Sequence, residues 1–123
     1  MIVSIHQPNY LPYPGFFNKI KSSDVFVIYD TAQYVKNRWD NRNRIRTKED
    51  WIYLTIPVAS KDSFKKAFID VKLPDNKKWL KKHWLSIFNN YSKSDHFKEH
   101  SSYFNEYYNN CNIDSLFEFN LGL

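Results

Sequence analysis

IHQPNYLPYPGFFNKI, residues 5–20, decides how the fold begins, because it joins an apolar strand to a helix through a proline-rich loop. Residues 2–6 are rich in β-branched side chains and form a run too short for a helix, so we predict a strand there. The three prolines between residues 8 and 14 fix φ and remove backbone donors, which predicts a stiff loop. Gly15, one of only two glycines in the chain, suggests a tight turn or a close approach of the backbone.

The end of this first strand carries residues suited to ligand binding. In α/β proteins, ligands bind beyond the carboxyl ends of the strands. His6 stands at that end, where an imidazole can transfer a proton near neutral pH or hold a phosphate or carboxylate. Gln7, Asn9 and Tyr10 follow it in the loop. The competing interpretation is a histidine that only fastens the loop to the fold.

A second strand follows closely and predicts a compact βαβ unit. Residues 15–21 favour a short helix, and residues 25–28 form a continuous apolar run, which is typical of a strand buried on both faces. Two strands joined through a helix are expected to be parallel, with a right-handed crossover. Asp30 then follows the second strand, beside His6 if the strands pair in parallel. It is a candidate catalytic partner of His6, or simply the end of the strand.

The middle of the chain predicts an antiparallel hairpin. Residues 31–50 have few apolar side chains and read as a long functional loop or an irregular hairpin. Residues 51–59 alternate between apolar and polar side chains, which indicates a strand with one buried face. After a polar surface turn over residues 60–67, residues 68–73 alternate again. We predict that residues 68–73 pair with residues 51–59.

The last third is helical by its periodicity. Apolar side chains recur every three or four positions over residues 77–91, and a second helical segment covers about residues 95–108. A third apolar helix starts after Asp114. We expect one α/β domain over residues 1–123, with helices covering the sheet, and either a second subunit or a missing carboxyl-terminal half to complete its core.

The segment YVKNRWDNRNRIRTK, residues 34–48, concentrates positive charge. Six of its positions are basic and only Asp40 is acidic, and arginine replaces the lysine that dominates elsewhere. A guanidinium can hold a phosphate or carboxylate at two points, and an extended segment would place alternate arginines on one side. A charged edge strand explains the same residues equally well. The candidate substrate-binding residues are Gln7, Asn9, Tyr10, Gly15, Asn41, Arg42, Asn43, Arg44 and Arg46.

Composition narrows the classes of function. The 123 residues carry a formal net charge of +5, which suits an anionic small molecule but is a weak signal for nucleic acid, even though Tyr34, Trp39 and Trp51 could stack on bases. Two glycines leave no phosphate-binding loop, and we predict no bound cofactor. The lone Cys111, the lack of a signal peptide and the lack of a long apolar run indicate a cytoplasmic protein without membrane insertion.

His96, Glu99 and His100 match the H-x-x-E-H pattern of inverted zinc peptidases. With only three fixed positions, chance matches are common, and a third ligand would have to come from His83 or Glu106. We therefore predict no resident metal and keep a zinc-dependent hydrolase as a minor alternative.

Four motifs together resemble one known family. IHQPNYLPYPGFFNKI, DVFVIYDTAQY, NRNRIRT with the following WIYLTIPV, and WLKKHWLSIFNNY occur in the order found in the WbqC-like family. The resemblance covers nearly the whole chain. That family is associated with bacterial O-antigen and other surface-polysaccharide gene clusters, and its members are typically near twice this length.

The resemblance implies modification of an activated amino sugar, by transfer of an acyl or aminoacyl group. On the residues themselves, we expect Arg42, Arg44 and Arg46 to hold the phosphates or carboxylate of the substrate. His6 would move a proton, assisted by Gln7, Asn9 and Asp30. The alternative is a non-catalytic module that binds nucleotide sugars or RNA.

Overall fold

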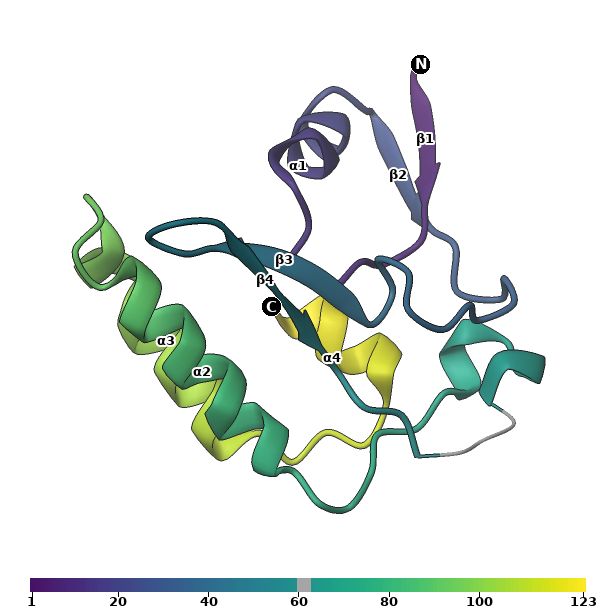
Figure 1. The fold of residues 1–123 in the computed structure, drawn as a ribbon. Coiled ribbons are helices and arrows are strands. Elements are labelled where there is room, and N and C mark those ends of the chain that lie inside the picture. The colour runs from purple at the N-terminus through teal and green to yellow at the C-terminus, as the bar shows by residue number, and fades with distance from the viewer. Residues whose placement is uncertain (60–62) are drawn as a thin grey trace.

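The computed structural model describes residues 1–59 and 63–123 and confirms a mixed α/β fold. It contains a parallel sheet of β1 and β2, an antiparallel sheet of β3 and β4, and the helices α1 to α4 (Figure 1). None of the helices in the described part of the chain has the length and apolar character needed to cross a bilayer.

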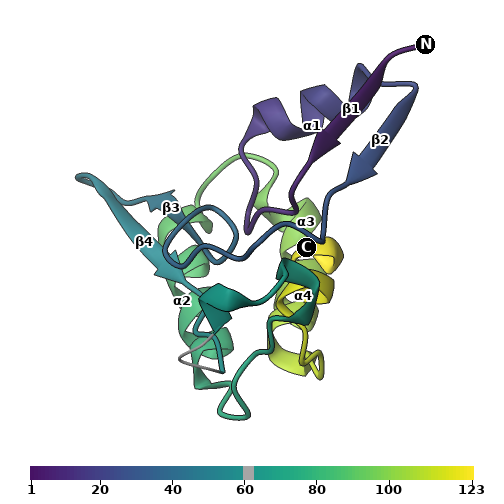
Figure 2. The ribbon, with the colours of Figure 1, turned by 90° about the vertical axis from the view of Figure 1, so that its right-hand side faces the viewer.

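The first unit has the predicted βαβ form. β1 (Val3–His6) and β2 (Val25–Ile28) are parallel, with His6 opposite Ile28, and α1 (Pro14–Lys21) connects them. Pro14 stands in the first turn of α1, where its missing N–H costs no helical hydrogen bond. Figures 1 and 2 show this unit projecting from the rest of the molecule.

The sheet of β1 and β2 is covered on only one face. Phe16 of α1 packs edge-on against Phe26 and His6, with ring centroids 5.5 and 5.0 Å away. On the opposite face, Val25 and Val27 are 46% and 40% exposed. The prediction of a second strand buried on both faces was therefore wrong for this chain, because one short helix can cover only one side of two strands.

The antiparallel hairpin contains one of the two predicted strands, with a different partner. β4 (Trp51–Thr55), within the predicted strand of residues 51–59, pairs with β3 (Arg42–Arg46), which lies inside the segment interpreted as a long loop or an irregular hairpin. The turn closes where Thr47 N–H donates to the Asp50 carbonyl (2.8 Å) and Asp50 N–H to Thr47 Oγ1 (3.0 Å). A four-residue turn closes at a smaller entropy cost than the long connection that pairing with residues 68–73 requires.

Residues 68–73 do not form the predicted strand. Phe68–Asp70 is a 3₁₀ turn, η2, and Lys72 forms an isolated bridge with Ser115. One backbone bond, from Ala59 N–H to the Lys72 carbonyl (2.8 Å), joins the two segments that we expected to pair. Of the predicted turn over residues 60–67, a 3₁₀ turn occupies Ser63–Lys65, and residues 60–62 lie outside the described residues.

The helical third agrees with its periodicity. α2 (Lys78–Tyr91) and α3 (Phe97–Asn110) lie side by side beneath the β3–β4 hairpin, and α4 (Leu116–Gly122) lies at the centre (Figures 1 and 2). Their apolar faces meet the hairpin in one aromatic-rich core. Its fully buried members include Tyr10, Tyr34, Ile56, Phe68, Val71, Tyr108, Leu116 and Phe119.

A chain of hydrogen bonds in this core ties the opening loop, residues 7–13 between β1 and α1, to the helices. The hydroxyl of Tyr10 lies 2.9 Å from His83 Nδ1 and 2.6 Å from the hydroxyl of Tyr108. Burial lowers the pKa of His83 to about 4, although a hydrogen bond to the Thr55 backbone opposes this shift. Burial therefore favours the uncharged imidazole, whose Nδ1 can accept a hydrogen bond from the hydroxyl of Tyr10.

The buried His83 predicts a loss of stability in mild acid. In the unfolded chain it binds a proton near pH 6.5, whereas in the folded chain it does so only near pH 4. The free energy of unfolding should therefore fall as the pH drops from about 6.5 to 4, by about 3 kcal/mol. Urea unfolding across this range measures the slope. His83→Gln should flatten it and His100→Gln, on the exposed surface, should not; equal slopes in both variants would contradict the assignment.

Candidate functional site

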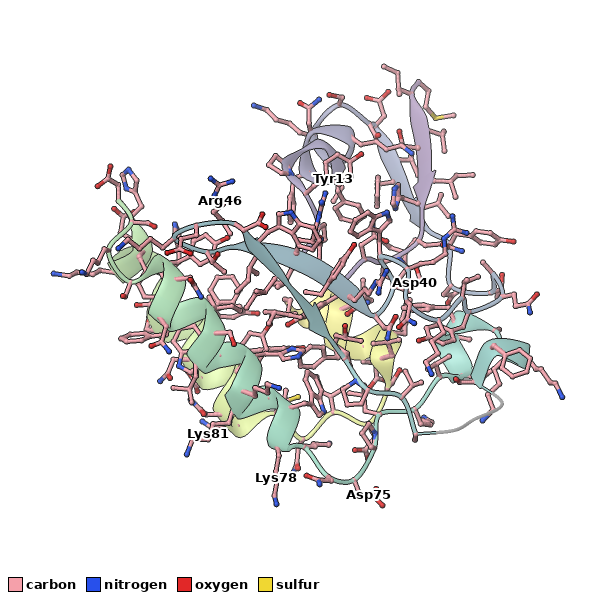
Figure 3. The ribbon with its side chains drawn as sticks, viewed as in Figure 1. Tyr13, Asp40, Arg46, Asp75, Lys78 and Lys81 are labelled. Carbon is pink, nitrogen blue, oxygen red and sulfur yellow. The ribbon has the colours of Figure 1, made fainter. Side chains whose placement is uncertain are left out.

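A cavity of about 650 Å³ lies between the βαβ unit and the free edge of β3. Figure 3 shows Tyr13 and Asp40 in this region, Tyr13 below α1 and Asp40 beside β3. The lining comes from the opening loop, from the segment before β3 and from β3 itself. These residues are His6, Gln7, Asn9, Tyr13, Val35, Arg38, Trp39, Asp40, Asn43 and Arg44.

His6 is oriented by its own loop. Its Nδ1 lies 2.7 Å from the carbonyl oxygen of Gln7, and the ring is half-buried against Phe16. A carbonyl oxygen only accepts, so Nδ1 carries the proton that is donated to it. Nε2 is therefore the nitrogen that can take a proton from a ligand or return one.

Asp40, rather than Asp30, is the carboxylate of the cavity. Its side chain is buried, and this desolvation raises its pKa above the ordinary value. A hydrogen bond from the Val35 backbone and the positive charges of Arg38 and His6 oppose the rise. Asp30 follows β2 but does not line the cavity, and its backbone carbonyl accepts from Ile69 N–H (3.0 Å). His6 thus shares the cavity with a carboxylate, which comes from Asp40, ten positions further along the chain than the predicted Asp30.

The arginines of β3 share one face but not one site. Arg42 stacks on Tyr53 at 4.2 Å and Arg44 on Trp51 at 4.9 Å, measured from the guanidinium carbon to the ring centroid. Of the three alternating arginines, only Arg44 lines the cavity of His6, and Arg38 supplies its second guanidinium. Arg46 lies toward the turn of the hairpin, pointing away from Asp40 (Figure 3).

Two asparagines hold the site together. Asn43 Nδ2 donates to the carbonyl oxygens of Tyr10 (3.2 Å) and Leu11 (2.7 Å), which ties the opening loop to β3. Asn120 Nδ2 of α4 donates to the carbonyl oxygens of Pro8 (3.2 Å) and Asp40 (2.7 Å). The loop and the acid are thereby fastened to one another through a buried helix.

Other predicted binding residues point elsewhere. Tyr10 is fully buried and faces His83, so its ring does not enter the cavity. Asn41 is also buried, and its amide donates to the Ile56 carbonyl (2.9 Å). Gly15 lies in the first turn of α1, where a Cβ would collide with the ring of Tyr13. Its small size therefore makes room for a cavity-lining ring.

The site contains residues that were not selected from the sequence. Tyr13, Arg38, Trp39, Asp40 and Asn120 either line the cavity or hold its walls. Asp40 carried a signal, since it is the single acid in the basic segment of residues 34–48. Asn120 carried none, because only the fold brings the last helix under the first loop.

The zinc pattern does not form a metal site. His96 Nδ1 lies 2.7 Å from Glu99 Oε1 at the exposed start of α3, and His83 is engaged with Tyr10. Within residues 1–59 and 63–123, no group of three or more His, Cys, Asp or Glu side chains is arranged to hold a metal ion.

This chain is similar to known proteins of one family. The model of the WbqC-like protein family matches residues 7–123. The chain is 42% identical over 97 residues to the uncharacterized protein Rv1507c of Mycobacterium tuberculosis, a match that covers 79% of this chain and 42% of that protein. The chain thus spans less than half the length of this relative. No solved structure matches it.

The electrostatics of the site can be tested at Asp40. Removing a neighbouring positive charge should raise its pKa further, so His6→Gln and Arg38→Gln should each move the Asp40 carboxyl titration upward. Lys36→Gln removes an exposed charge of the same segment that does not line the cavity and serves as the control. Carbon-detected NMR of the carboxyl groups measures the shift. An unchanged Asp40 titration in both variants would show that the three groups do not interact.

Proposed function

The chain belongs to the WbqC-like protein family, and from this we propose that it modifies an activated amino sugar of bacterial surface-polysaccharide (O-antigen, lipopolysaccharide) biosynthesis by acyl or aminoacyl transfer in the cytoplasm. One observation carries the proposal: a histidine, a buried carboxylate and two arginines line a single cavity of about 650 Å³. That volume lies within the usual range for small-molecule sites, which is roughly 300–1,000 Å³.

The arginines provide the anion site. Arg38 and Arg44 line the cavity and suit the phosphates of a nucleotide-linked sugar. The stacking of Arg44 on Trp51 limits the freedom of its guanidinium and leaves the N–H groups at its edge for the ligand. Arg42 and Arg46, which we expected to share this role, lie outside the lining of this cavity.

His6 provides the proton transfer. As the sugar amine attacks the carbonyl carbon of an acyl ester or thioester, a C–N bond forms and the bond to the leaving group breaks. Nε2 of His6 accepts the proton that the amine loses and returns it to the departing oxygen or sulfur. Asp40, whose charge interacts with His6, favours the transient imidazolium. Gln7 and Asn9 line the same cavity and can orient sugar hydroxyls by hydrogen bonds.

The proposed activity is that of the whole WbqC-like protein. The relative from M. tuberculosis is more than twice as long as the matched segment. Parallel sheets are ordinarily covered on both faces, and here Val3, Ile5, Val25 and Val27 are exposed. We propose that a further segment of the family's longer chain packs on this face of β1 and β2.

A second candidate function is a binding module without catalysis. The exposed face of the hairpin alternates arginines with Trp51 and Tyr53, which are 42% and 41% exposed. Such a face can stack on the bases of a nucleotide or of single-stranded RNA. Stabilisation of the protein by a short RNA, with none by nucleotide sugars, would favour this function over transfer.

The anion site predicts a contrast between two arginines of one strand. Arg44→Gln should weaken the binding of a UDP-linked amino sugar about tenfold or more, because charged hydrogen bonds to the phosphates are lost. Arg46→Gln removes the same charge from the same face two residues away and should change the affinity less than twofold. Titration calorimetry measures both. Equal losses in the two variants would indicate diffuse attraction to a basic strand and would contradict the proposed site.

The catalytic assignment is tested separately at His6. In the full-length protein with its acyl donor, His6→Ala should lower turnover about 10²- to 10⁴-fold while binding of the sugar nucleotide is retained. Unchanged turnover would show that His6 is not the proton carrier. If sugar-nucleotide binding is also normal in that variant, the role of His6 is limited to holding the conformation of the loop.

A further inference from the structure

A second cavity, of about 400 Å³, opens on the other side of the opening loop. It lies between β3, the loop and the facing ends of α2 and α3. Its walls are mainly apolar, and their apolar side chains are Leu11, Ile45, Trp84, Ile87, Phe97 and Phe104. The polar residues of the lining are Arg44, Tyr91, Ser94, Asp95, His96, His100 and Ser101. Water in such a cavity gains few hydrogen bonds, so its walls favour an apolar occupant.

The two cavities meet at one residue. Arg44 lines both the cavity of His6 and the apolar cavity. The opening loop and Arg44 together separate the two cavities, and we call them the partition. In the loop, Asn9 and Tyr13 line the first cavity and Leu11 lines the second. A molecule that places an anionic or carbonyl group near Arg44 can therefore reach both cavities.

The partition is built with some strain. Leu11 has a φ of 45°, in the left-handed region that a branched side chain rarely adopts. Asn43 holds this conformation through its hydrogen bond to the Leu11 carbonyl (2.7 Å). Strained backbone persists where surrounding contacts enforce it, often at ligand sites. Here the strained residue contributes a side chain to the apolar cavity.

We propose that the apolar cavity binds the hydrocarbon part of an acyl group whose carbonyl carbon lies at Arg44, in the cavity that His6 also lines. This inference rests on the proposed function and deepens it, because it selects an unbranched or aromatic apolar acyl group over a charged aminoacyl group. The acyl chain lies between β3, the opening loop and the facing ends of α2 and α3, and the sugar nucleotide occupies the polar cavity. Arg44 lies at the boundary, where the acyl carbonyl becomes polarised.

A series of linear carboxylates tests the acyl site. Binding of butanoate to dodecanoate, each below its micelle concentration, is measured by titration calorimetry. Each added methylene that enters the cavity should tighten binding about fourfold, until the cavity is filled and the affinity levels off. An affinity independent of chain length would overturn the acyl site.

Neighbouring serines of α3 provide a matched pair of variants. Ser101 lines the apolar cavity, whereas Ser102 is exposed and does not. Ser101→Phe should make the affinity level off at a shorter chain, and Ser102→Phe should leave the series unchanged. Ile87→Ala enlarges the cavity and should shift the levelling-off to longer chains, which gives a change of opposite sign. The same series in all three variants would overturn the acyl site.

The outcomes separate this inference from the proposed function. If butanoate binds, Arg44→Gln weakens it and chain length has no effect, the acyl site is refuted and the polar site stands. If Arg44→Gln leaves butanoate affinity unchanged while longer chains still bind more tightly, the hydrocarbon binds away from Arg44. That result would contradict both the place of Arg44 between the two ligand groups and its role in the anion site.

Discussion

The loop between β1 and α1 cannot be held by regular backbone hydrogen bonds, because prolines interrupt its donors. Its carbonyl groups need partners from elsewhere, since unpaired buried polar groups are costly. The side-chain amide of Asn43 donates hydrogen bonds to the carbonyl oxygens of Tyr10 and Leu11. The side-chain amide of Asn120 donates to the carbonyl oxygen of Pro8. Two side chains, from the middle and the end of the chain, thereby fix the conformation of the first loop.

This fastening determines where the chemistry is placed. Tyr10 is drawn into the core, where its hydroxyl meets His83 and Tyr108, so the residues before it must turn toward β3. His6 then shares a cavity with Arg44, although the two belong to different sheets. Asn120 also binds the carbonyl of Asp40, so the acid and the loop are positioned by the same amide.

Local patterns predicted the fold where neighbours in sequence decide it. The β-branched run before His6 and the period of α2 both led to correct elements, as did the parallel pairing of β1 with β2. The pattern of residues 68–73 misled because alternation over six residues does not distinguish a strand from a 3₁₀ turn followed by an isolated bridge. β3 was expected only as one of two interpretations, a charged edge strand, and its pairing with β4 was missed because its exposed face is arginine, which carries no apolar signal.

The candidate site was predictable by region and for part of its residues, since the lining includes the candidates His6, Gln7, Asn9, Asn43 and Arg44. Proline density marked the loop, and the change from lysine to arginine marked residues 34–48. The assignment of Asp30 followed from strand ends alone, whereas Asp40 reaches the cavity through a turn before β3 that no periodicity describes. Asn120 depends on contacts between the two ends of the chain, which a local pattern cannot contain.

The central claim is that one cavity, bounded by the opening loop and β3, binds the sugar nucleotide. Amide NMR of the labelled protein, titrated with a UDP-linked amino sugar, tests it most directly. We predict that the largest shifts fall on Gln7, Asn9, Asp40, Asn43 and Arg44, with little change on the exposed face of β1 and β2. Shifts confined to that face, or to the arginines of the hairpin turn, would contradict the account.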